Sequence, residues 1–223
     1  MSDQPAPTTR SARRAEQDQR LANDITAAQQ MIATAQNDSE IVHALETRSI
    51  NAAAFAQGLA FALAAQDKFT ARQIAVNSKK AATAALDQAV AAARALFTEY
   101  RATARIAFSD RNLRATLGAS GLVSADNQKF ITFARAACAA AEAYQGNLYD
   151  YGFTAEKLAA LRAALDACSE AQEAQNGAVG AAQSATAARD TAYAELKGWV
   201  KHFAAVARLA FRTRRDLLAK LNL

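Results

Sequence analysis

Few residues of this 223-residue chain could bind a metal or act in acid–base catalysis, because it has only two histidines. Glu40 and His43 have the Glu-x-x-His spacing that supplies two ligands from one helical turn in di-iron bundles. Such a site needs a second motif of this kind and two further glutamates, yet the other histidine, His202, has Trp199 three residues before it. The sequence therefore predicts no metal site and no cofactor.

Motifs of nucleophilic catalysis and phosphate binding are also missing from the sequence. Cys138 and Cys168 are too few for a disulfide framework and lack metal-ligand spacing, so we expect buried free thiols and a cytoplasmic location. Residues 1–21 are polar and contain no apolar core segment, which predicts that the chain has no signal peptide. We therefore expect no enzymatic activity and no catalytic residue.

Basic side chains form the remaining group with possible chemistry, since they could bind a polyanion. The net charge of the chain is +5, whereas residues 197–223 alone contain seven basic residues and one acid. The candidate anion or partner contacts are Arg105, Arg208, Arg212, Arg214 and Arg215. Helix capping is the alternative, because cations near a helix C-terminus are stabilised by the helix dipole. No helix-turn-helix, zinc finger or aromatic stacking platform accompanies these arginines.

The elements that carry these residues are expected to be helices. The chain contains 62 alanines, and its two prolines both lie within the first seven residues. Alanine has the highest helix propensity and proline the lowest. The composition therefore predicts an all-α protein whose helices pack closely through small residues.

An internal similarity at an offset of 103 residues organises the chain. Ala104-Arg-Ile-Ala-Phe108 matches Ala207-Arg-Leu-Ala-Phe211, and Tyr100 matches Phe203. We interpret the similarity as a duplication that produces two tandem, pseudo-symmetric helical units. The predicted organisation is a flexible basic N-terminal arm at 1–20, unit one at 21–118 and unit two at 119–223, the two units together forming one elongated domain.

Each unit is predicted to contain a short helix and a long one, arranged as an elongated, coiled-coil-like bundle. The short helices are expected at about 22–46 and 126–146, with breaks near 48–50 and 150–153. Asn51 and Thr154 are natural N-cap residues for the long helices that follow. A stop at Ser109 and Asp110 and a further short helix to Leu117 should end the first unit.

The long helices are indicated by seven-residue periodicity, which is typical of coiled coils. Positions 55, 62, 69, 76, 83, 90, 97 and 104 are Phe, Ala, Phe, Val, Thr, Val, Phe and Ala, and the same phase recurs from 158 to 207. The unbroken phase favours one helix from Asn51 to Phe108. A hairpin that bends back near 73–78 and 175–180 stays open as the alternative, since Gln175-Asn-Gly177 is a turn signal.

Residues 49–66, at the start of the first long helix, carry no charge, which raises the question of whether they could span a membrane. The segment is mostly alanine and includes Asn51, Gln57 and Gln66. The matching segment of the second copy contains four charged residues, and matching segments should share an environment. The sequence therefore predicts no transmembrane segment.

Apolar and aromatic positions of the second copy form an extended pattern. It comprises Tyr151-Gly-Phe-Thr-Ala-Glu-Lys-Leu158, an alanine-rich run, Trp199-Val-Lys-His-Phe203, Ala207-Arg-Leu-Ala-Phe211 and a closing Leu217-Leu-Ala-Lys-Leu221. This pattern resembles a widespread group of uncharacterised, alanine-rich, all-helical bacterial proteins, most clearly over residues 80–223. The resemblance implies helical packing, and no known activity attaches to that group.

These observations favour a non-enzymatic structural, assembly or scaffolding protein that acts through helix surfaces and self-associates into a homo-oligomer. The alternative is a basic module that binds a polyanion, either nucleic acid or an anionic membrane surface, through its C-terminal segment.

Overall fold

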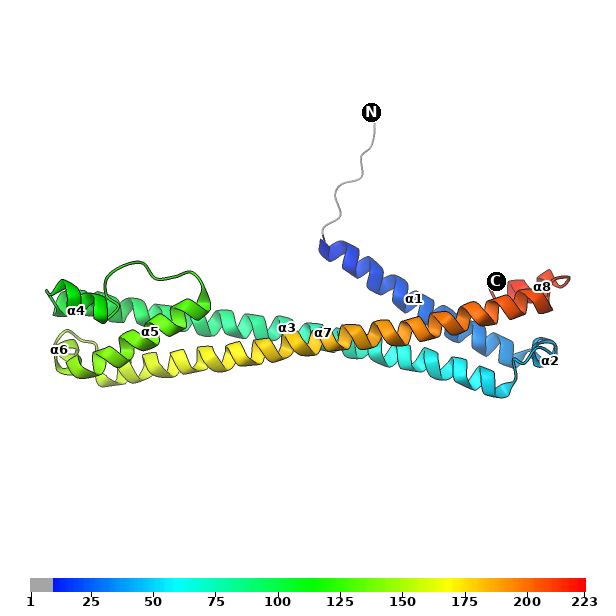
Figure 1. Cartoon of the computed structure of the whole chain (residues 1–223), viewed down its shortest axis with the longest axis horizontal. Coiled ribbons are helices and arrows are strands. Elements are labelled where there is room, and N and C mark those ends of the chain that lie inside the picture. The colour runs from blue at the N-terminus through cyan, green and yellow to red at the C-terminus, as the bar shows by residue number, and fades with distance from the viewer. Residues whose placement is uncertain (1–9) are drawn as a thin grey trace, which may run out of the picture. The chain divides into compact units, whose positions relative to one another are not determined.

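The computed structural model describes residues 10–223, and every regular element in that range is a helix (Figure 1). The predicted all-α class is therefore confirmed, and the helices pack against one another as a bundle. In chain order the elements are α1 (Arg10–Asn37), α2 (Ser39–Glu46), α3 (Ala52–Ala107), α4 (Arg111–Thr116), α5 (Asn127–Ala141), the 3-10 helix η1 (Glu142–Tyr144), α6 (Gln145–Asp150), α7 (Ala155–Ala210) and α8 (Arg215–Lys220).

Both long helices are continuous, as the unbroken seven-residue phase predicted. Helices α3 and α7 each contain 56 residues, and their first residues lie 103 positions apart. The alternative of a hairpin is wrong, since Gly177 lies inside α7. A single glycine costs a helix interior only about 1 kcal/mol relative to alanine, which the packing of a long helix easily overcomes.

The first short helix differs from its predicted range of 22–46. Helix α1 begins at Arg10, inside the segment predicted as a flexible arm, and ends at Asn37. Residues 1–9 of the predicted arm lie outside the described residues. A new helix, α2, starts because the Asp38 carboxylate accepts hydrogen bonds from the backbone N–H groups of Glu40 (3.1 Å) and Ile41 (3.3 Å). This N-cap divides what was predicted as one helix.

The second copy has its break at the matching place, between Ala141 and Glu142, where α5 gives way to η1 and then α6. The predicted single helix at 126–146 is therefore wrong in the same way as the first. The predicted breaks near 48–50 and 150–153 are confirmed, and Asn51 caps α3 by accepting a hydrogen bond from the Ala54 N–H (3.1 Å).

Two compact units divide the chain, and they do not coincide with the tandem units at 21–118 and 119–223. Unit 1 comprises residues 1–75 and 182–223, and unit 2 comprises residues 76–181. Each compact unit therefore combines the first part of one sequence copy with the last part of the other.

The core of unit 1 consists of two clusters. One gathers Phe55 of α3 and Phe203 of α7, whose rings meet edge to face with centroids 6.0 Å apart, around the buried Leu45 of α2. The other joins Ile25 of α1 to Phe69 of α3 and to neighbouring alanines. Small residues at these positions allow the helices of the unit to approach closely.

The core of unit 2 uses matching positions of the other copy. Tyr100 corresponds to Phe203; it is fully buried, and its ring lies 5.4 Å from that of Phe153. Its hydroxyl donates a hydrogen bond to the carbonyl of Leu117 (3.0 Å), and burial raises its pKa. Leu148 and Leu158, the counterparts of Leu45 and Phe55, are buried in the same cluster.

Candidate functional site

The basic residues predicted as anion contacts fall into two groups. Arg208, near the end of α7, is exposed, as are Arg212 in the following turn and Arg215 at the start of α8. The side chains of these three arginines make no hydrogen bond or ion pair within residues 10–223. Their guanidinium groups are free to bind an external anion.

Arg214 differs from these three because it is held inside unit 1. It pairs with Glu40 of α2 and with Asp216 of α8, whose Oδ2 lies 2.8 Å from its Nη2. The hydrogen bonds that Arg214 donates to Asp216 and Glu40 raise the pKa of Arg214, and the Arg214 guanidinium lowers the pKa of Asp216. Arg214 therefore fastens α8 to α2.

Arg105 also differs, since it belongs to the internal structure of unit 2. Its Nε donates a hydrogen bond to the carbonyl of Ala119 (2.7 Å). The Arg101 Nε likewise donates a hydrogen bond to the carbonyl of Gly118 (2.7 Å), and the Arg114 Nη2 donates one to the carbonyl of Arg105 (2.8 Å). At this end of unit 2, Arg101 and Arg105 therefore hold the loop that follows α4 through its backbone carbonyls.

A second candidate surface lies on the outward face of α3, where sequence reasoning predicted no site. We name it the outer seam, with residues Ala52, Ala56, Leu59, Leu63, Gln66, Thr70 and Ile74. Successive members are three or four residues apart, which places them on one face of a helix. Leu59, Leu63 and Ile74 are 38%, 52% and 63% exposed. The uncharged run at 49–66 was the signal that could have found this surface.

The matching face of α7 is engaged within unit 2. Leu59 and Leu63 correspond to Arg162 and Asp166 at the offset of 103. Arg162 pairs with Glu142 (2.7 Å), and Asp166 pairs with Arg135 of α5 (2.5 Å). The two copies therefore use this face differently: α7 forms ion pairs within the chain, whereas α3 leaves aliphatic side chains in solvent.

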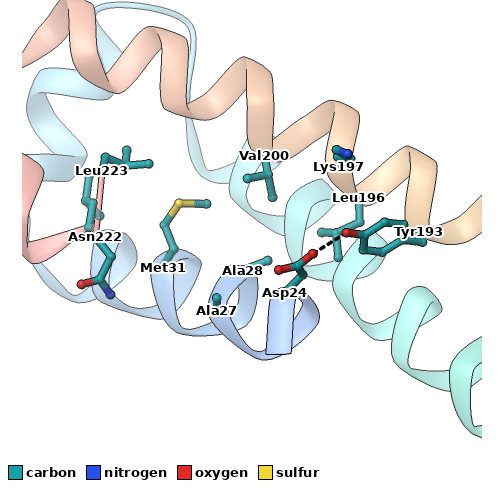
Figure 2. Close-up of a pocket in the computed structure, with 11 residues that line it drawn as sticks. Asp24, Ala27, Ala28, Met31, Tyr193, Leu196, Lys197, Val200, Asn222 and Leu223 are labelled. Atoms are coloured by element: carbon teal, nitrogen blue, oxygen red, sulfur yellow. Dashed lines mark hydrogen bonds between the residues drawn. The ribbon is translucent and has the colours of Figure 1, made fainter. Parts of the chain in front are cut away.

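A hollow of about 280 Å³ lies between α1, α7 and the last residues of the chain (Figure 2). Its walls are mainly apolar, from Met31, Leu196 and Val200 among others. At one side the hydroxyl of Tyr193 donates a 2.5 Å hydrogen bond to the Asp24 carboxylate. Because this carboxylate already has its partner, the hollow presents one internal polar contact and no catalytic arrangement.

The thiols are buried, as predicted. Cys138 is 3% exposed and Cys168 is fully buried, and burial raises the pKa of both thiols, that of Cys138 to about 11. A thiol with a raised pKa is a poor nucleophile. Among residues 10–223, no three His, Cys, Asp or Glu side chains lie where they could hold a metal ion together.

None of the helices between residues 10 and 223 combines the length and the apolar character that a membrane-crossing helix needs. Comparison with protein-family models, with curated proteins and with solved structures finds no match to this chain.

Proposed function

We propose that the protein is a non-enzymatic assembly module, and that it associates with a second copy of itself through the outer seam of α3. The observation that carries this proposal is the exposure of Leu59, Leu63 and Ile74 on one face of a helix. The outer seam extends over three heptads, from Ala52 to Ile74, and a pattern of that length is typical of a helix that packs against a partner helix.

A second copy of the chain suits this surface better than a charged partner. The outer seam itself contains no charged residue, so it has nothing with which to attract a charged surface. Two copies of the seam would meet without repulsion, and an isologous pairing requires only that the surface complement itself. The small residues at Ala52 and Ala56 would let the two α3 helices approach closely.

The proposal also places the protein in a reducing compartment such as the cytoplasm. Cys138 and Cys168 are free and buried, which fits a protein that folds and works without disulfides.

Sedimentation equilibrium over a range of micromolar concentrations tests this function. The wild-type chain should show a reversible monomer–dimer equilibrium, and Leu63→Glu should be monomeric because it places two like charges at the paired seams. Since Leu63 is 52% exposed, the variant should keep its helical circular dichroism.

Ile106→Glu is the matched control for this experiment. Ile106 is also an exposed aliphatic residue of α3, at 68%, but it lies outside the outer seam. The control should dimerise like the wild type. A wild-type chain that remains monomeric throughout, or equal loss of dimer in both variants, would show that α3 does not pair in this way.

A further inference from the structure

Five basic side chains at one end of unit 1 have no counter-ion among residues 10–223. We name them the basic strip: Lys197, Lys201, Arg208, Arg212 and Arg215. All five are exposed, and none makes a hydrogen bond or an ion pair within the described part of the chain. Their charge is therefore available to an anion outside the molecule.

The helix arranges the first three of these residues on one face. Lys197, Lys201 and Arg208 are four and seven residues apart, which returns each to the same side of α7. They extend along about 16 Å of helix axis. Arg212 and Arg215 continue the series into the turn and into α8.

Three carboxylates of this end of unit 1 are paired with cations outside the basic strip. Lys220 pairs with Asp38 (2.7 Å), whose pKa is lowered mainly by this hydrogen bond. Arg214 holds Glu40 and Asp216. Glu195 is an unpaired acid of α7, but it lies about 120° around the helix from Lys201. The basic strip therefore keeps its positive charge.

The basic strip differs from the arginines at the matching end of unit 2, whose side chains donate to backbone carbonyls of their own unit. Arg105 donates to the carbonyl of Ala119 (2.7 Å), whereas the side chain of its counterpart Arg208 donates to no carbonyl of residues 10–223. Both copies have an arginine at this position, but only the arginine of the first copy is hydrogen-bonded within its unit. Unit 1 leaves this position free for a ligand.

We propose that the basic strip binds the sugar–phosphate backbone of a nucleic-acid duplex without preference for base sequence. A duplex presents about nine phosphates over the 16 Å that α7 contributes, so each cation has a phosphate within reach. Apart from His202, the uncharged exposed residues of α7 between 194 and 209 are Ala194, Gly198, Ala205 and Leu209, which have no groups to read base edges. Leu209, at 60% exposure, is the one large apolar side chain among them. A single leucine offers little to insert into lipid, and this favours a nucleic acid over a membrane surface.

Fluorescence anisotropy with a labelled DNA duplex of arbitrary sequence tests the proposal. Five phosphate contacts predict a log–log salt dependence with a slope of about −4.5, so that raising the salt from about 50 to about 200 mM weakens binding about 500-fold. The triple variant Arg208→Gln, Arg212→Gln and Arg215→Gln should flatten the slope to about −2.

The control variant is Lys79→Gln, Lys80→Gln and Arg111→Gln, which removes the same charge from exposed, unpaired residues of unit 2. It should keep the wild-type slope. Absence of binding at low salt would overturn the proposal, as would equal losses in the two triple variants, which would mean that net charge alone is responsible.

Vesicles of phosphatidylcholine and phosphatidylserine distinguish the two polyanion classes. Tighter binding to these vesicles than to the duplex, lost in the basic-strip variant, would assign the strip to a membrane surface and overturn the nucleic-acid proposal. The dimerisation variant Leu63→Glu should keep the salt slope of the wild type, because the outer seam and the basic strip share no residue. The two proposals can therefore fail separately.

Discussion

Gly58 of α3 and Trp199 of α7 are in direct contact in unit 1. A Cβ atom added at Gly58 would lie 2.5 Å from the indole Cε2 of Trp199, closer than such atoms approach. The indole also stacks on Phe203, with ring centroids 5.2 Å apart. The absent side chain of Gly58 thus provides the space in which the only tryptophan of the chain packs.

Gly58→Ala should therefore destabilise the protein by about 1–3 kcal/mol, since overpacking costs more than the gain in helix propensity. Chemical denaturation followed by circular dichroism measures the change. Gly177→Ala is the control, because nothing lies within 4 Å of its added Cβ and the substitution should stabilise α7 by about 1 kcal/mol. Equal behaviour of the two variants would mean that Trp199 is not confined by α3.

Ser49→Gly should stabilise the protein by about 0.5–1 kcal/mol. Ser49 has φ = 68°, a left-handed conformation that glycine adopts without strain, and its counterpart Gly152 has φ = 85°. In both copies the next residue donates a backbone hydrogen bond to the carbonyl of a buried leucine. The Ile50 N–H donates to Leu45 (3.1 Å), and the Phe153 N–H donates to Leu148 (3.0 Å). These contacts end the preceding helix in the same way.

The reciprocal change, Gly152→Ser, supplies the control in thermal melting. It should lower the melting temperature, whereas Ser49→Gly should raise it. A rise or a fall in both variants would contradict the equivalence of the two turns.

Local patterns were sufficient to predict the long helices and much of their buried face. The seven-residue phase identified Phe55, Phe97 and Ala104, which are all buried, and the match of Tyr100 with Phe203 identified two fully buried aromatic positions. Such positions can be read from sequence because helical periodicity relates residues that are near in the chain.

Other features could not be read in this way because they depend on residues far apart in the chain. Helix α1 starts earlier than predicted, and its residue Asp18 pairs with Arg72 and Arg189, which are 54 and 171 residues away. The different hydrogen bonding of Arg105 and Arg208 also depends on tertiary contacts rather than on local sequence. The two arginines match in sequence, and only the position of surrounding carbonyls and carboxylates separates a side chain bonded within its unit from a free one.

Asp18→Asn should destabilise the protein by about 2 kcal/mol. Asp18 joins α1 to both long helices, with its carboxylate 2.5 Å from Arg72 and 3.2 Å from Arg189, and Arg189 is only 6% exposed. Losing one partner of a buried ion pair costs about 3–5 kcal/mol, and the remaining pair of Arg189 with Asp190 reduces this cost. Denaturant unfolding measures the change.

Asp166→Asn is the comparison for this variant, since it breaks a pair with Arg135 in which both side chains are largely exposed. It should cost less than about 1 kcal/mol. If both substitutions have equally small effects, the three-helix contact of Asp18 contributes little to stability.

Arg189→Leu should cost only about 1 kcal/mol, because Asp18 keeps its 2.5 Å pair with Arg72 and Asp190 is largely exposed, so that neither carboxylate is left buried without a partner. Leu86 occupies the matching position in unit 2 and is buried there. The same denaturant experiment tests this expectation. A loss larger than that of Asp18→Asn would mean that the arginine stem and its charge are both required.

Asp24→Asn should lower the pKa of Tyr193 from about 12 toward the ordinary value of 10.0. Burial is the main cause of the raised pKa, and the hydrogen bond to Asp24 and its negative charge add to it, so the variant should remove only part of the shift. Because the folded pKa is raised, Tyr193 contributes stability that is fully present below about pH 10 and is lost as the pH rises through about 12.

The ultraviolet absorbance of tyrosinate, with Tyr193→Phe to identify the signal, measures this pKa. The difference in melting temperature between the wild type and Asp24→Asn should shrink as Tyr193 ionises, because tyrosinate and the Asp24 carboxylate repel each other. An unchanged pKa in Asp24→Asn would mean that this hydrogen bond does not hold α1 against α7 in solution.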